Sequence, residues 1–166
     1  MKNNILPLVD ALAEKLIAKH QRLSVAESCT GGGIAHSLTE KAGSSQWFEC
    51  GFVTYSNQSK QDMLGVNAST LKQYGAVSEN TAVEMAEGAL VHSQSDVSCS
   101  VTGIAGPDGG SDEKPVGLVW FAWSIGTAGS NEPQTQSEKM IFKGGRAAVR
   151  EQAVEHALQG ILKILK

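Results

Sequence analysis

The sequence has few cysteines, few aromatic residues and no excess of positive charge. Its 166 residues carry 14 Lys and Arg against 17 Asp and Glu, a net charge of −3. A protein that coats nucleic acid would have a basic surface, so we expect no nucleic-acid partner. The three cysteines form no C-x-x-C pair, which argues against a disulfide framework or a structural zinc site and is typical of reduced thiols.

Long apolar runs are also missing. Asp10, Glu14, Lys15 and Lys19 interrupt the first twenty residues, which therefore resemble neither a signal peptide nor a membrane span. We expect a cytoplasmic protein without a membrane partner. No linker, repeat or low-complexity tract divides the chain, so residues 1–166 are predicted to form a single domain.

Several familiar catalytic patterns are absent. The four histidines lie in or beside predicted helices, away from every glycine-rich turn, so a Ser-His-Asp triad is not expected. There is no G-x-G-x-x-G fingerprint, and Tyr55 and Lys60 are five residues apart instead of four, which excludes the tyrosine–lysine pair of short-chain reductases. Asp108, Asp112 and Glu113 match no calcium loop. We therefore expect no metal and no cofactor.

Glycine is plentiful, with 18 residues, many of them in turns between predicted elements. Periodicity and capping residues predict an α/β protein, a three-layer α/β/α sandwich with a mixed central sheet. The predicted helices cover 4–19, 34–41, 56–64, 79–93 and the segment from 145 onward; the predicted strands cover 23–27, 48–55, 97–104, 116–125 and 139–142, with an exposed loop at 126–133.

The turn at 28–33 joins a predicted strand to a predicted helix. Its three consecutive glycines let a ligand approach the backbone, and the first N–H groups of the helix could hold an oxyanion or a phosphate. Ser28 is a candidate nucleophile, although G-x-S-x-G itself is absent. A structural serine in an ordinary glycine-rich turn explains the segment equally well. On the catalytic interpretation, Thr30, Gly31 and Gly32 contact the substrate.

Tyr55 and Lys60 form the second candidate group. If Tyr55 ends its strand and Lys60 lies in the short helix that follows, both could face one cleft beside Ser28. A Ser–Lys pair needs a desolvated amine that is neutral near pH 7, and a glycine-walled pocket could provide this environment. The alternative is a solvent-exposed lysine and a tyrosine that only packs.

A second glycine-rich segment, 102–110, follows the predicted central strand. Ligands of open α/β sheets bind beyond the carboxyl ends of the strands, so this loop and the Ser28 turn could border one crevice. A plain glycine-rich connection remains the alternative. The predicted substrate contacts here are Thr102, Gly103 and Ala105.

Arg146 follows two glycines at a predicted helix start. A cation in the first turn opposes the helix dipole, so an anionic ligand explains its position better than helix stability does. We therefore predict that Arg146 binds phosphate; a solvent-exposed arginine is the alternative.

Five segments together resemble the C-terminal domain family of the competence-damage protein CinA: AESCTGG (26–32), GFVTYSNQSK (51–60), GAVSE (75–79), TGIAGPDGGSDEKPVG (102–117) and GRAAVR (145–150). The resemblance covers nearly the whole chain. It implies a three-layer α/β/α fold, commonly a homodimer, that hydrolyses the carboxamide of nicotinamide mononucleotide to nicotinate mononucleotide and ammonia without a metal. It also implies that Ser28 is the nucleophile and that Lys60 and Tyr55 activate it. A nucleotide-binding regulatory module without catalysis is the alternative function.

Overall fold

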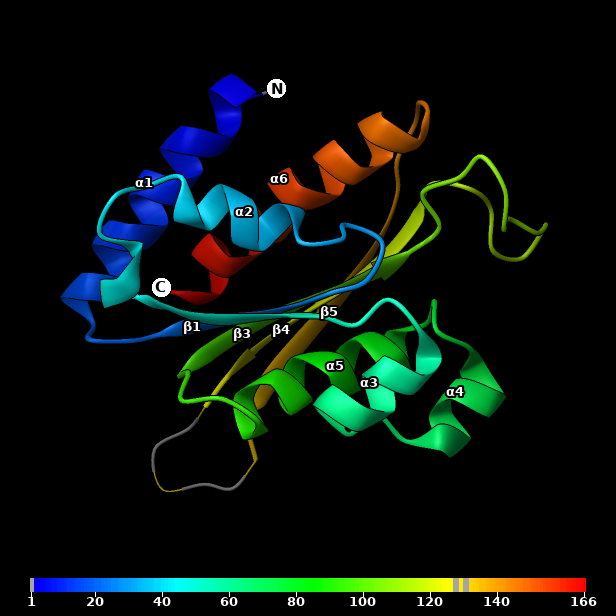
Figure 1. The fold of residues 1–166 in the computed structure, drawn as a ribbon, viewed down its shortest axis with the longest axis horizontal. Helices are drawn as coiled ribbons and strands as arrows, with labels where there is room; N and C mark the ends of the chain where they lie inside the picture. Colours follow the sequence, from blue (N-terminus) through cyan, green and yellow to red (C-terminus); the bar gives the residue numbers. More distant parts are fainter. Residues whose placement is uncertain (1, 127–128, 130–131) are drawn as a thin grey trace.

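The computed structural model describes residues 2–126, 129 and 132–166, which form one five-stranded sheet between two layers of helices (Figure 1). This arrangement confirms the predicted three-layer sandwich. The strands are β1 (Leu23–Glu27), β2 (Phe48–Val53), β3 (Val97–Gly103), β4 (Leu118–Ile125) and β5 (Gln134–Ile141), and the helices are α1 (Lys2–Ala18), α2 (Gly33–Thr39), α3 (Asn57–Leu64), α4 (Ala68–Tyr74), α5 (Glu79–Val91) and α6 (Arg146–Ile164).

The sheet is mixed, with the strand order β2-β1-β3-β4-β5. β1 lies parallel to both β2 and β3, whereas β4 runs antiparallel to β3 and to β5. The carboxyl ends of β1 and β3 therefore meet at the same edge of the sheet. Just beyond this edge, the Ser28 N–H donates to the carbonyl oxygen of Val101 over 3.0 Å, which joins the first glycine-rich turn to the central strand.

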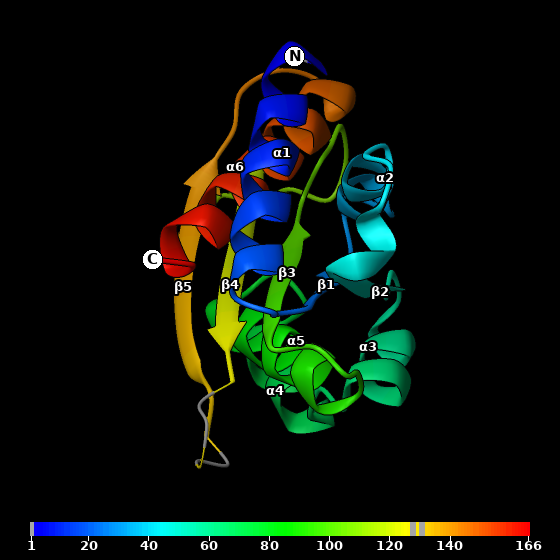
Figure 2. The same ribbon diagram turned by 90° about the vertical axis from the view of Figure 1, so that its left-hand side faces the viewer.

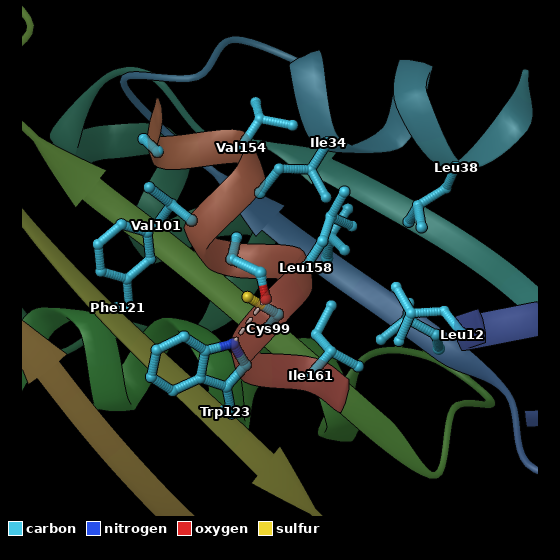
Figure 3. Close-up of a cluster of buried hydrophobic side chains, with 14 of the residues drawn as sticks. Leu12, Ile34, Leu38, Cys99, Val101, Phe121, Trp123, Val154, Leu158 and Ile161 are labelled. Carbon is cyan, nitrogen blue, oxygen red and sulfur yellow. Dashed lines mark hydrogen bonds between the residues drawn. The ribbon is translucent and has the colours of Figure 1, made fainter. Parts of the chain in front are cut away.

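Helices α1, α2 and α6 cover one face of the sheet, and α3, α4 and α5 cover the other (Figures 1 and 2). On the first face, α6 packs closely against β4 (Figure 3). The indole of Trp123 lies against Gly160, where a Cβ atom would stand 2.1 Å from the ring, and its Nε1 donates to the carbonyl of Ala157 over 3.0 Å. Gly160 thus allows α6 to pack closely against β4 in this core.

On the second face, the small polar residues of β3 hold α5. The hydroxyls of Ser98 and Ser100 donate to the helix carbonyls of Ala86 and Ala82, both over 2.6 Å. Each serine is buried, and each hydrogen bond satisfies a hydroxyl that would otherwise lose its water. The sequence predicts these serines only as small polar residues of a strand and gives no sign of their hydrogen bonds to α5.

Three differences from the predicted elements matter most, and several other element ends differ by one or two residues. Helix α4 was not predicted, because only Thr70 and Leu71 of its seven residues are buried and so no apolar periodicity marks it. β5 begins at Gln134 instead of residue 139, since an edge strand with a polar outer face lacks a hydrophobic run. β2 ends at Val53, before Tyr55. The predicted loop 126–133 includes positions outside the described residues. None of the described helices is long and apolar enough to cross a membrane.

Candidate active site

Ser28 is the first residue after β1 and lies in a turn that only glycine allows. Gly31 and Gly32 have φ angles of 57° and 94°, in the left-handed region that side-chain-bearing residues rarely adopt. The Gly31 N–H donates to the carbonyl of Ser28 over 3.0 Å, which closes the turn. The chain thereby enters α2 while Ser28 stays at the sheet edge, where 8% of its surface is exposed.

The N-terminus of α2 is occupied by Glu27, the residue that precedes Ser28. Its carboxylate is fully buried and accepts hydrogen bonds from the N–H groups of Gly32, Ile34 and Ala35, over 3.1, 3.0 and 2.9 Å. These donors are therefore not free for a ligand. The expectation that the N–H groups of this helix hold the oxyanion or phosphate of the substrate is corrected accordingly.

Lys60 comes from α3 and is fully buried. The Ser56 hydroxyl accepts the N–H of Ser59 over 3.0 Å and so caps the helix that carries Lys60. The Lys60 Nζ donates to the hydroxyl of Ser28 over 3.0 Å, and to the carbonyls of Thr54 and Tyr55 over 2.8 and 3.3 Å. Within the described chain, no carboxylate pairs with this amine. Burial lowers the pKa of Lys60 from 10.5 to about 8.

The contacts of Lys60 are compatible with a neutral amine whose lone pair faces Ser28. A neutral amine has two N–H groups and one lone pair. The carbonyls of Thr54 and Tyr55 can take the two N–H groups, which leaves the lone pair directed at the Ser28 hydroxyl. This geometry is the one that a base requires to take the serine proton.

Cys29 is the competing nucleophile at this turn. Its thiol is buried, and this burial raises its pKa to about 11. The sulfur is therefore protonated near neutral pH, when the thiol is a poor nucleophile. Ser28, which has a basic partner within hydrogen-bonding distance, is the better candidate.

A cavity of about 270 Å³ opens above Ser28 and Lys60. The predicted contacts Thr102, Gly103 and Ala105 line it, together with Tyr55 and Arg146. The structure does not bring Thr30, Gly31 and Gly32 into this lining. Thr30 instead borders a separate cavity of about 320 Å³ between α1, α2 and α6.

Ala76, Val77 and Asp108 also line the cavity above Ser28 and Lys60, and the sequence analysis did not assign them to the site. The Ala76 carbonyl accepts the Thr102 hydroxyl over 2.8 Å, which attaches the segment before α5 to the end of β3. One signal in the sequence could have pointed to Ala76 and Val77. They belong to the GAVSE segment, which is part of the family pattern although it contains no obvious catalytic residue.

Arg146 also lines the cavity, but unlike the buried Lys60 it is exposed to solvent. Its Nη1 donates to the carbonyl of Gly106 over 2.8 Å, and its Nη2 donates to the phenolic oxygen of Tyr55 over 3.2 Å. Tyr55 thus has two partners. Its backbone carbonyl contacts Lys60, whereas its phenol contacts Arg146, and the residue is 61% exposed.

In the described part of the chain, no side chain caps the N-terminus of α6, which carries Arg146. Gly145 provides no side-chain cap, and the backbone bond from Val149 to Gly145 is the first of the helix. The N–H groups before Val149 are consequently available to an anion, and the arginine beside them adds positive charge. Among the described residues, no group of three His, Cys, Asp or Glu side chains could hold a metal ion.

Comparison with known proteins agrees with this arrangement. The nicotinamide-nucleotide amidohydrolase PncC of Escherichia coli K12 is 50% identical over 157 residues, which cover 95% of this chain and 92% of that protein. The PncC protein of Pseudomonas putida is 46% identical and covers 96% of each chain. The crystal structure of the competence/damage inducible protein CihA from Agrobacterium tumefaciens superposes with a TM-score of 0.93 at 43% identity and covers 98% of this chain and 96% of that one.

The family model described as the CinA C-terminal domain matches residues 6–165, a range that includes every residue of the Ser28–Lys60 cavity. Both the full-length similarity and the fold support this match. The chain belongs to the CinA C-terminal domain family.

Proposed function

We propose that this protein hydrolyses the carboxamide of nicotinamide mononucleotide to nicotinate mononucleotide and ammonia. The observation that carries the proposal is the buried Lys60 amine, 3.0 Å from the Ser28 hydroxyl and without a carboxylate partner in the described chain. A Ser–Lys pair of this kind is suited to acyl transfer from an amide. Relatives that carry the name nicotinamide-nucleotide amidohydrolase supply the substrate class.

Acylation begins when neutral Lys60 takes the hydroxyl proton of Ser28 and Oγ attacks the amide carbon. The carbonyl electron pair moves onto oxygen and gives a tetrahedral oxyanion. When this intermediate collapses, the C–N bond breaks and Lys60 returns its proton to the departing nitrogen, which leaves as ammonia. Ala105 and Gly106 line the cavity, and their N–H groups, which have no acceptor among the described residues, are the candidate oxyanion donors in this proposal.

Deacylation repeats these steps with water. Lys60 takes a proton from the water molecule, whose oxygen attacks the ester carbon, and the ester C–O bond to Ser28 then breaks. Lys60 returns the proton to the Ser28 oxygen, and the carboxylic acid product ionises to nicotinate mononucleotide. One amine thus serves as base and acid in both halves of the reaction, so no second titrating side chain is needed.

Arg146 and the N-terminus of α6 bind the substrate phosphate in this proposal. The guanidinium is held by the Gly106 carbonyl, and the helix behind it offers unpaired N–H groups. The phenol of Tyr55, which contacts Arg146, belongs to this end of the site. This role differs from the activation of Ser28 that the family resemblance implied for Tyr55.

The test is ammonia release from nicotinamide mononucleotide, measured with and without a chelator, for the wild type and for Ser28→Ala. We expect wild-type turnover and none in the variant, while isothermal titration shows that the variant still binds the nucleotide. Ser69→Ala, at an exposed position on α4, is the matched control and should retain full activity.

Retained activity in Ser28→Ala would contradict the assignment of Ser28 and make Cys29 the candidate nucleophile, which Cys29→Ala tests directly. Saturable binding without turnover in the wild type would instead indicate a regulatory nucleotide-binding module. The homodimer and the cytoplasmic location remain predictions, which sedimentation and cell fractionation can test.

A further inference from the structure

The cavity contains a carboxylate that the reaction steps above do not use. Asp108 lies in the loop between β3 and β4 and lines the cavity with Ser28 and Arg146. Its side chain is exposed, and in the described part of the chain no cation or hydrogen-bond donor contacts it. Arg146 likewise has no acidic partner there. Asp108 and Arg146 therefore border the same cavity as opposite charges that do not pair with each other, and Lys60 is a second basic group of the lining.

The loop that carries Asp108 has a shape fixed by glycine. At Gly106, φ is 81° and a Cβ atom would stand 2.5 Å from Cγ1 of Val116; at Gly110, a Cβ atom would stand 2.9 Å from Cγ2 of the same valine. The loop is thus packed closely on Val116. The bond from Arg146 to the Gly106 carbonyl also anchors the arginine to this loop, two residues from Asp108.

We propose that Asp108 selects the positively charged ring of the substrate while Arg146 takes the phosphate. This inference rests on the proposed function. Nicotinamide mononucleotide carries a positive pyridinium and a negative phosphate, which are opposite in charge to Asp108 and Arg146 respectively. A carboxylate near the ring favours the charged, oxidised pyridine over a neutral ring by a Coulomb attraction that grows as the ligand excludes water.

The reduced 1,4-dihydro form of the same mononucleotide separates this role from others. It retains the carboxamide, ribose and phosphate, but its ring is neutral. If Asp108 only accepted hydrogen bonds from ribose hydroxyls, or only shaped the loop, it would support the oxidised and reduced nucleotides equally. Charge selection, in contrast, affects the oxidised form alone.

The experiment measures the dissociation constants of both nucleotides by isothermal titration in a Ser28→Ala background, in which no turnover occurs. Asp108→Asn should weaken binding of the oxidised nucleotide roughly three- to tenfold, as expected for one partly exposed charge pair, and should leave binding of the reduced form unchanged. The loss should shrink as salt is added. Asp112→Asn removes the same charge from the same exposed loop outside the cavity lining, and it should change neither constant.

Equal weakening of both nucleotides, or no change in either, would overturn the proposal. So would an equal effect of Asp112→Asn, since that result would reflect net charge alone. Failure of the proposed function is recognised separately, because it appears as absence of ammonia release by the wild type in an assay that does not involve Asp108.

Discussion

The helices α2 and α6 both begin at glycine-rich turns near the catalytic cavity, yet the structure uses their N-termini in opposite ways. At α2, the buried carboxylate of Glu27 takes three backbone N–H groups. At α6, no side chain caps the helix, and Arg146 adds a cation where the helix dipole disfavours one. The protein itself satisfies the first terminus, whereas we propose that the substrate phosphate binds at the second.

The same contrast divides the cavity into a buried end and an exposed end. Among the lining residues, Lys60 is fully buried and Ser28 nearly so, whereas Tyr55 and Arg146 are exposed; Glu27, which precedes Ser28 outside the lining, is also fully buried. Removing a buried polar group leaves its partners unsatisfied, while an exposed group is replaced by water. We therefore expect substitutions at the buried end to reduce kcat strongly and substitutions at the exposed end to raise KM moderately.

The largest effect should come from Lys60. Lys60→Arg keeps the positive charge but cannot release a proton near neutral pH, so kcat should fall by about 10³-fold or more. Lys60→Met, which fits the buried site more easily, should lose as much. Lys72→Arg on the exposed surface of α4 is the control. An active Lys60→Arg variant would show that only charge is needed and that Lys60 is not the base.

The pH dependence tests the same amine in the unmodified protein. Burial places the pKa of Lys60 at about 8, and the base must be neutral, so kcat/KM should rise with pH below that value and level off above it. At pH 7, roughly a tenth of the protein is in the active form. A rate that is flat from pH 6 to 9 would contradict the assignment.

Glu27→Gln weakens the hydrogen bonds at the N-terminus of α2 and should have the next largest effect on activity. The amide NH₂ would face backbone donors, which leaves at least one buried N–H unsatisfied and lowers the free energy of unfolding by about 2–3 kcal/mol, or roughly 5–10 °C in Tm. Because the Ser28 turn then shifts, kcat should fall roughly tenfold to a hundredfold with KM nearly unchanged.

The matched control for this substitution is Glu40→Gln, at the exposed C-terminal end of α2, where His36 is the one ionic partner of the carboxylate among the described residues. It should change stability by less than about 0.5 kcal/mol. If Glu27→Gln behaves like Glu40→Gln in both thermal melting and kinetics, the two helix termini do not differ in the way the hydrogen bonds indicate.

Arg146→Ala tests the open terminus. Loss of a charge-assisted contact to phosphate should lower kcat/KM for the mononucleotide roughly tenfold to a hundredfold. Nicotinamide riboside, which has no phosphate, should be a poor substrate of the wild type and should lose little more. Lys143→Ala removes a nearby exposed cation outside the cavity lining as the control. Equal losses for nucleoside and nucleotide would exclude Arg146 as the phosphate contact.

At the buried end of the site, the sequence predicts some residues and misses others. Apolar periodicity predicts the three layers, and the strand-to-helix turn singles out Ser28 as a residue at the sheet edge. For Lys60, the sequence left a desolvated amine beside Ser28 and a solvent-exposed lysine as alternatives. The polar segment NQSKQ resembles a solvent-facing helix, and Lys60 becomes buried only where α3 meets the end of β1. Glu27 was not singled out for a related reason: its three partners come within reach only after the left-handed turn at Gly31 and Gly32.

Tyr55→Phe should have the smallest effect, and its result decides to which end of the cavity the phenol belongs. The hydroxyl accepts one hydrogen bond from Arg146 over 3.2 Å at an exposed position, so water can replace it, and KM for the mononucleotide should rise about threefold or less with kcat unchanged. The carbonyl of Tyr55, which contacts Lys60, is untouched by this substitution. A hundredfold fall in kcat would instead indicate that the phenol acts on the reacting groups, as the family resemblance implied. The exposed end of the cavity would then take part in the chemical step together with Ser28 and Lys60.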